Sequence, residues 1–122
     1  MKFKESVITD EPVKGLSTFI IPTKVKDVVT ISGSMLGGIL FSGNENNKIS
    51  SLTSSMLDKG TQNKSKHQIS DELESMGAEI SFISSTRHIN FTAHCLKSDL
   101  RPVVELVAEQ LKHPVFPEEE LA

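Results

Sequence analysis

The stretch "AEISFISSTRHINFTAHCL", residues 78–96, predicts a β-hairpin, and the class of the fold follows from it. Apolar and polar residues alternate in it with a period of two, which is typical of half-buried strands. The second strand divides into an apolar face, Ile89, Phe91, Ala93 and Cys95, and a polar face, His88, Asn90, Thr92 and His94. One face of this hairpin is therefore expected to lie against other elements of the protein.

Helices are predicted on both sides of the hairpin. Before it, Ser65 and Gln68 have the spacing of a capping box, and Gly77 suits a left-handed helix end. After it, Ser98 is the expected cap of a second helix that ends near Pro114. Its expected buried stripe consists of Leu100, Val103, Val104, Val107 and Leu111.

The residues further towards the N-terminus predict two strands and one more helix. The strands are expected at residues 16–24 and 27–35, where β-branched residues are dense, and the helix within "KISSLTSSMLDKGT", residues 48–61. The order is therefore strand, strand, helix, helix, hairpin, helix. This order predicts an α+β fold, a mostly antiparallel sheet with helices packed on one face.

Length and charge narrow the class of protein. With 122 residues the chain is at most one domain, and its net charge of −3, with lysines spread among acids, argues against a nucleic-acid partner. No apolar run reaches the roughly 20 residues of a membrane span, and the N-terminus lacks the apolar core of a signal peptide. The compartment stays open between the cytoplasm and, where a signal has been removed, the periplasm.

Metal-binding and nucleophilic residues form no convincing site. His88 and His94 share a strand face, but six residues at about 3.3 Å each separate them by roughly 20 Å, too far for one ion. Cys95 lies on the apolar face and is interpreted as a small core residue. The sequence thus predicts no metal and no cofactor.

Serines mark one side of the helix expected within residues 48–61. Ile49, Leu52, Met56 and Leu57 are expected to form its packing face. The opposite side carries Ser51, Ser54, Ser55 and Asp58. The spacing i, i+3, i+4 is that of helix-borne zinc sites in which two histidines bind the metal and a glutamate is the general base. A neutral serine hydroxyl can fill neither role.

The stretches "SLTSSMLDKGT" (51–61), "SKHQISDELESMGAEIS" (65–81) and "LRPVVELVAEQLKHPVFPEEEL" (100–121) together resemble the pitrilysin/insulinase-type zinc peptidases. Mitochondrial processing peptidase and the core subunits of the cytochrome bc1 complex belong to the same family. The resemblance covers most of residues 28–122, with Gly60-Thr61 and Gly77 in place.

The resemblance implies the fold of a metallopeptidase half-domain without its chemistry. Aligned on Gly60-Thr61, the family's H-x-x-E-H motif falls on residues 51–55, so that Ser51, Ser54 and Ser55 replace the two zinc histidines and the catalytic glutamate. No catalytic and no metal-binding residue is therefore expected. The strand that pairs with substrate backbone in active relatives corresponds to Glu79, Ile80, Ser81, Phe82, Ile83 and Ser84. Peptide binding there needs only the strand's own N–H and C=O groups.

The expected function is that of a non-catalytic partner, either a subunit beside an active peptidase or its second half-domain. Good helix-start signals around Pro117 lie close to the last residue, so residues 1–122 are expected to be a single partial domain from a longer protein. Two alternatives stay open. In the first, the chain is the inert half of an active peptidase whose zinc motif lies outside residues 1–122. In the second, it is a scaffold subunit that resembles the core proteins of respiratory complexes.

Overall fold

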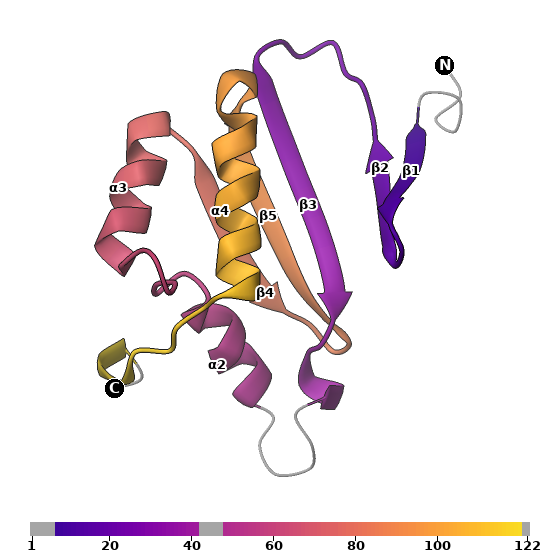
Figure 1. Ribbon diagram of the computed structural model, residues 1–122. Coiled ribbons are helices and arrows are strands. Elements are labelled where there is room, and N and C mark those ends of the chain that lie inside the picture. The colour runs from indigo at the N-terminus through magenta and orange to yellow at the C-terminus, as the bar shows by residue number, and fades with distance from the viewer. Residues whose placement is uncertain (1–6, 42–47, 121–122) are drawn as a thin grey trace.

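The computed structural model describes residues 7–41 and 48–120 (Figure 1). The strands are β1 (Ile8–Val13), β2 (Leu16–Ile20), β3 (Val28–Leu36), β4 (Glu79–Ser84) and β5 (His88–Leu96). The α-helices are α2 (Ile49–Met56), α3 (Lys66–Met76) and α4 (Leu100–Lys112). Short 3₁₀ turns are η1 (Ile39–Phe41), η2 (Lys97–Asp99) and η3 (Glu118–Glu120). No helix in the described ranges is long and apolar enough to cross a membrane.

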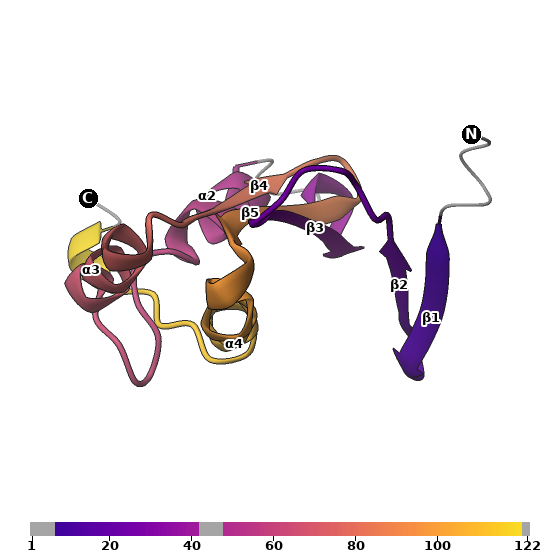
Figure 2. The ribbon, with the colours of Figure 1, turned by 90° about the horizontal axis from the view of Figure 1, so that it is seen from above.

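The predicted α+β class is confirmed, but the strands form two antiparallel sheets. β3, β5 and β4 lie in that order, with the hairpin strand β5 in the centre, and β1 pairs with β2 in a separate hairpin. β1 was not expected from the sequence, because its six residues "ITDEPV" combine charges and a proline that are rare in strands. In Figures 1 and 2 this hairpin stands beside β3, on the side of the sheet away from β4.

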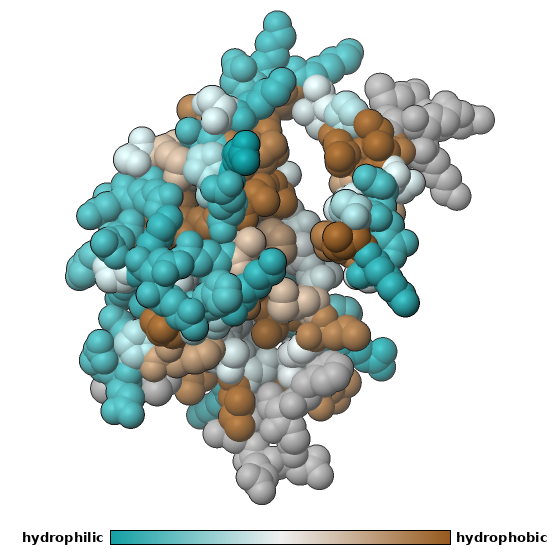
Figure 3. Space-filling model, viewed as in Figure 1, coloured by the Kyte–Doolittle hydropathy of each residue, from teal (hydrophilic) through white to brown (hydrophobic). Residues whose placement is uncertain are grey.

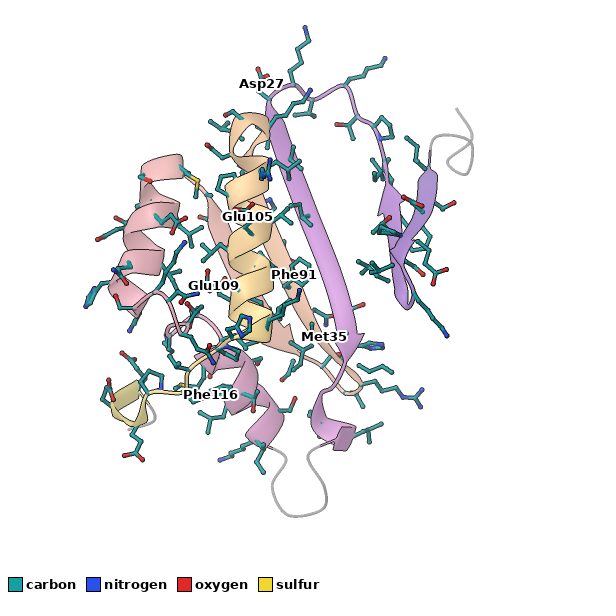
Figure 4. The ribbon with its side chains drawn as sticks, viewed as in Figure 1. Asp27, Met35, Phe91, Glu105, Glu109 and Phe116 are labelled. Carbon is teal, nitrogen blue, oxygen red and sulfur yellow. The ribbon has the colours of Figure 1, made fainter. Side chains whose placement is uncertain are left out.

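One face of the three-stranded sheet is apolar and is covered by α4 (Figure 2). The register places Ile31, Ala93 and Ile80 in one row across the three strands, and Gly33, Phe91 and Phe82 in the next. Ala93 and Cys95 are buried against Val103 and Val107 of α4, with Phe91 packed at the margin (Figure 4). A Cβ atom on Gly33 would overlap the Phe91 ring, so the missing side chain leaves the space that this ring occupies.

The ends of α3 agree with the sequence prediction. Ser65 Oγ accepts a hydrogen bond from the Gln68 N–H, and Gln68 Oε1 accepts one from the Ser65 N–H, which completes the capping box. Gly77 ends the helix with φ 61°, in the left-handed region. Leu73 and Met76 of this helix pack against the core.

Three details of the C-terminal third correct the prediction. Ser98 does not cap α4, because the chain first forms the turn η2, in which the Leu100 N–H bonds to the Lys97 carbonyl. In α4, four of the five residues expected in the buried stripe are buried or pack against the core: Leu100, Val103, Val107 and Leu111. The fifth, Val104, is 46 % exposed, and Leu106 is buried at 1 % exposure, so the stripe is rotated towards Leu106. The helix expected after Pro117 is only η3 where the structure describes it, and residues 121–122 lie outside the described residues.

Candidate functional site

Helix α2 carries the serine positions and lies beside the end of β4 (Figure 1). The Ser51 and Ser84 hydroxyl oxygens are 3.3 Å apart and hydrogen-bonded. Ser84 belongs to the apolar side of the sheet, since it pairs with Ile89, so α2 lies on the same side as α4. The structure thus brings α2, which carries the motif positions 51–55, into contact with β4, the predicted substrate strand.

The orientation of α2 differs from the expected one. Met56 and Leu57 are buried as predicted, but Ile49 and Leu52 are 45 % and 47 % exposed. The buried positions in their place are Ser50 and Ser54, each 5 % exposed. Ser50, Ser54 and Leu57 follow at i, i+4 and i+7, so they form one stripe along the helix. The small side chains of Ser50 and Ser54 leave room for neighbouring elements to pack closely against the helix. Their i, i+4 spacing indicates the buried stripe, but a search for apolar residues misses it.

Three hydroxyl groups of α2 donate to carbonyl oxygens of the helix itself. Thr53 Oγ1 donates to the Ile49 carbonyl at 2.8 Å, Ser54 Oγ to the Ser51 carbonyl at 2.9 Å, and Ser55 Oγ to the Leu52 carbonyl at 2.9 Å. This back-bonding uses the hydroxyl protons within the helix. Ser51 and Ser55 are exposed and Ser54 is buried, so the three oxygens do not meet at one point on the surface.

The family's zinc ion does not fit this set of residues. Three neutral hydroxyls, each hydrogen-bonded to protein, offer neither the imidazole nor the carboxylate or thiolate donors that zinc takes. Among the residues that the structure describes, no three His, Cys, Asp or Glu side chains lie close enough to hold a metal ion. His94 instead pairs its Nδ1 with Thr30 Oγ1 at 3.1 Å on the outer face of the sheet.

The pair Gly60-Thr61 joins α2 to the end of α4. Thr61 Oγ1 donates to Glu109 Oε1 and accepts the backbone N–H of Lys64 at 3.0 Å, while Thr61 forms a β-bridge with Pro114. Glu109 lies near the C-terminal end of α4 (Figure 4). The Gly-Thr step therefore fixes where α2 ends relative to α4, and this role does not depend on a metal.

The predicted substrate strand β4 is an edge strand. Its six residues pair with β5, and no second partner occurs among the described residues. Ile80 and Phe82 face the core side, whereas Glu79, Ser81 and Ile83 face outward, with Ile83 67 % exposed. The free edge of β4 therefore has backbone donors and acceptors available next to α2.

The Cys95 thiol is buried at 4 % exposure, as predicted. Its burial and, secondarily, the Asp99 carboxylate raise the pKa of the thiol. The folded protein therefore keeps this proton to higher pH than the unfolded chain, so the free energy of unfolding decreases as pH rises above the pKa of the thiol in the unfolded chain. We expect iodoacetamide, followed by mass spectrometry, to alkylate Cys95 slowly in native buffer and quickly in urea. Equal rates in both buffers would contradict the burial.

Comparison with known proteins agrees with this arrangement. Residues 20–122 match the family model "Insulinase (Peptidase family M16)". The α-1 subunit of the mitochondrial processing peptidase of Dictyostelium discoideum is 31 % identical over 84 residues, which cover 69 % of this chain and 13 % of that protein. The crystal structure of an inactive peptidase domain of the same family from Pseudomonas fluorescens superposes with a TM-score of 0.84 at 21 % identity. It matches 94 % of this chain, which spans 28 % of that one. The chain therefore belongs to the insulinase family of peptidases.

Proposed function

We propose that this chain is a non-catalytic insulinase-family domain that binds extended peptide at the edge of β4 and serves a peptidase as its structural partner. The observation that carries the proposal is the hydrogen bond between Ser51 and Ser84. It joins α2, whose motif positions hold no metal ligand, to β4, which is an edge strand among the described residues. A strand edge binds any backbone in extended form, so this binding survives the loss of the catalytic residues.

The exposed side of α2 supports peptide binding without cleavage. Ile49 and Leu52 offer exposed apolar surface, and the Ser51 and Ser55 oxygens offer hydrogen-bond acceptors. The motif positions are occupied by serines, which cannot act as a general base for hydrolysis. The Dictyostelium relative is named as a subunit, so it works within an assembly. A partner role in an assembly is the corresponding proposal for this chain, and the partner would carry the intact zinc motif.

Zinc analysis tests the non-catalytic part. After incubation with zinc and desalting, the wild-type chain is expected to hold far less than one zinc per chain by atomic emission. The double variant Ser51→His/Ser55→His places two imidazoles at i, i+4 on the exposed side of α2 and is expected to take up more zinc than the wild-type chain in equilibrium dialysis against zinc.

The matched control is Ser51→Ala/Ser55→Ala, which removes the same hydroxyls without adding ligands. Stoichiometric zinc in the wild-type chain would overturn the proposal. A histidine variant that folds but retains no more zinc than the alanine control would show that α2 does not present these positions on one surface.

A further inference from the structure

The hydrogen bonds between β4 and β5 determine which backbone groups of β4 reach its free edge. The Ser85 N–H donates to the His88 carbonyl oxygen at 2.7 Å, so these two residues form a hydrogen-bonded pair next to the turn. Hydrogen-bonded and non-hydrogen-bonded pairs alternate along an antiparallel ladder. The register of β4 with β5 continues from Ser84 to Glu79 without a shift. Every second residue, counted back from Ser85, therefore bonds to β5, and the residues between them direct their backbone groups away from it.

The other side of β5 leads to the same assignment. The Lys97 N–H donates to the Asp27 carbonyl and the Gly37 N–H to the Arg87 carbonyl, both at 2.9 Å. Both pairs continue the register of β3 with β5, so odd-numbered residues of β5 bond to β3 and even-numbered ones bond to β4. The edge-directed residues of β4, whose N–H and C=O groups reach its free edge, are Ile80, Phe82 and Ser84.

An added antiparallel strand meets the outward side chains of β4 at close range. Such a strand continues the antiparallel order of the sheet and takes its hydrogen bonds from the edge-directed residues. Glu79, Ser81 and Ile83 then lie opposite it in non-hydrogen-bonded pairs. In these pairs the Cα atoms are only about 4.5 Å apart and the side chains are closer than in hydrogen-bonded pairs. The outward face of β4 is therefore where side chains can select a bound strand most strongly.

The outward side chains differ between the two ends of β4. Glu79 is exposed, and among the described residues no hydrogen bond or ion pair reaches its carboxylate. Ser81 is small, and Ile83 is 67 % exposed. Pairs of opposite charge and pairs of β-branched or aromatic residues are favourable across strands. The edge thus offers a site for a cation and a site for an apolar side chain, four residues apart.

The two sides of the sheet differ in what lies beside β4. Figure 3 views the molecule from the side of α4, where hydrophilic residues cover most of α3 and line the front of α4. Ile80 and Phe82 face this side, which the helices already occupy. Glu79 and Ile83 face the opposite side and are exposed there. A strand at the edge therefore finds the exposed side chains of β4 on the side away from α4.

A second copy of β4 fits this edge poorly. Two antiparallel copies centred on Ser81 would set each Glu79 carboxylate opposite an Ile83 side chain. A carboxylate against an apolar side chain loses hydration without gaining a partner. A different strand, with a cation and an apolar residue in the matching places, satisfies both ends of β4 at once.

We propose that Glu79 and Ile83 select the peptide that binds at the β4 edge: an antiparallel strand with an apolar residue opposite Ile83 and, four residues later, a lysine or arginine opposite Glu79. This inference rests on the proposed peptide binding at β4 and names the sequence that the site accepts. The order follows from the direction of the strands, because an antiparallel peptide passes Ile83 before it reaches Glu79. The peptide residue opposite Ser81 is expected to be β-branched.

Two fluorescein-labelled peptides of identical composition and charge test the order. GTITTTRTG has isoleucine four residues before arginine, and GTRTTTITG is the same sequence reversed. Fluorescence anisotropy with this chain is expected to show roughly threefold to tenfold tighter binding of the first peptide. Hydrogen exchange by NMR is expected to slow at the amides of Ile80, Phe82 and Ser84 when it binds. The amides that already bond to β5 are expected to change little.

A pair of charge variants tests the role of Glu79. Glu79→Lys is expected to weaken binding of GTITTTRTG roughly threefold to tenfold and to strengthen binding of the same peptide with glutamate in place of arginine. Glu74→Lys is the matched control, because Glu74 is an exposed glutamate of α3 and its replacement changes the net charge equally. It is expected to change either affinity by no more than about twofold.

Different results would overturn this inference and the proposed function. Equal affinities of the two peptides, or equal effects of the two variants, with the edge-directed amides slowed, would overturn the selection and leave peptide binding at β4 in place. Tighter binding of the reversed peptide would indicate a parallel strand and also overturn it. No binding and no slowed amide in β4 would overturn both. Edge-directed amides that exchange slowly in the free chain would assign the edge to another segment or a second copy, and would likewise overturn both.

Discussion

Replacing Leu106 by alanine is expected to lower the free energy of unfolding by about 2–5 kcal/mol, the usual cost of such a deletion in a packed core. Leu106 lies on the buried side of α4 at 1 % exposure and is among the largest fully buried side chains described. Since a domain of this kind is stable by only about 5–15 kcal/mol, the variant loses a large part of its stability. Urea unfolding followed by far-UV circular dichroism measures the difference.

Val104→Ala is the matched control, because Val104 lies on the same helix but is 46 % exposed. Its expected loss is within about 0.5–1 kcal/mol. The comparison also tests the rotation of α4, since the periodicity of the sequence assigned Val104 and not Leu106 to the buried stripe. A larger loss at Val104 than at Leu106 would show that the helix is turned the other way.

The second large effect is expected for Gly38→Ala, at about 3 kcal/mol or more. Gly38 has φ 92°, where a side chain is strained, and an added Cβ would overlap the Ser85 carbonyl oxygen. It would also lie 2.9 Å from the His88 nitrogen and 3.0 Å from the Thr86 oxygen. All three are backbone atoms of the β4–β5 turn or of the first residue of β5, so relief requires moving the backbone there.

Gly77→Ala separates the steric contribution from the conformational one. Gly77 also has a positive φ, 61°, but no atom lies within 4 Å of an added Cβ. Its expected cost is only the left-handed strain of roughly 1–2 kcal/mol. Equal losses in the two variants, measured by thermal and urea unfolding, would argue against the close approach of Gly38 to the β4–β5 turn.

Local signals in the sequence predicted the elements whose formation depends on local contacts. The alternation in residues 78–96 predicted the hairpin, and Ser65, Gln68 and Gly77 predicted both ends of α3. Local signals gave wrong predictions where tertiary contacts determine the structure. Ser98 was a plausible cap, but the chain leaving β5 satisfies its backbone in η2 first. β1 pairs with β2, and the composition of β1 does not indicate this pairing.

The sequence predicted the helix that carries the serines but not its orientation. Ser51, Ser54 and Ser55 were expected on one helix, which is α2, whereas the contact between α2 and β4 was not predicted. Which side of α2 is buried depends on how closely the neighbours approach, and serine is small enough to lie at such a contact. Periodicity of apolar residues therefore put Ile49 and Leu52 inside and Ser54 outside, and all three side chains are reversed, since Ile49 and Leu52 are exposed and Ser54 is buried.

The central position of β5 also sets an order for folding. β5 pairs with β4 across a short turn, but its other neighbour β3 lies far away in the sequence, with Val28 opposite Leu96. Closing the long loop between β3 and β5 costs chain entropy before any of their contacts form, whereas the β4–β5 hairpin closes locally. The hairpin is thus expected to form early, and the docking of β3 to limit the folding rate, so β5 would spend this interval with one edge open to other chains.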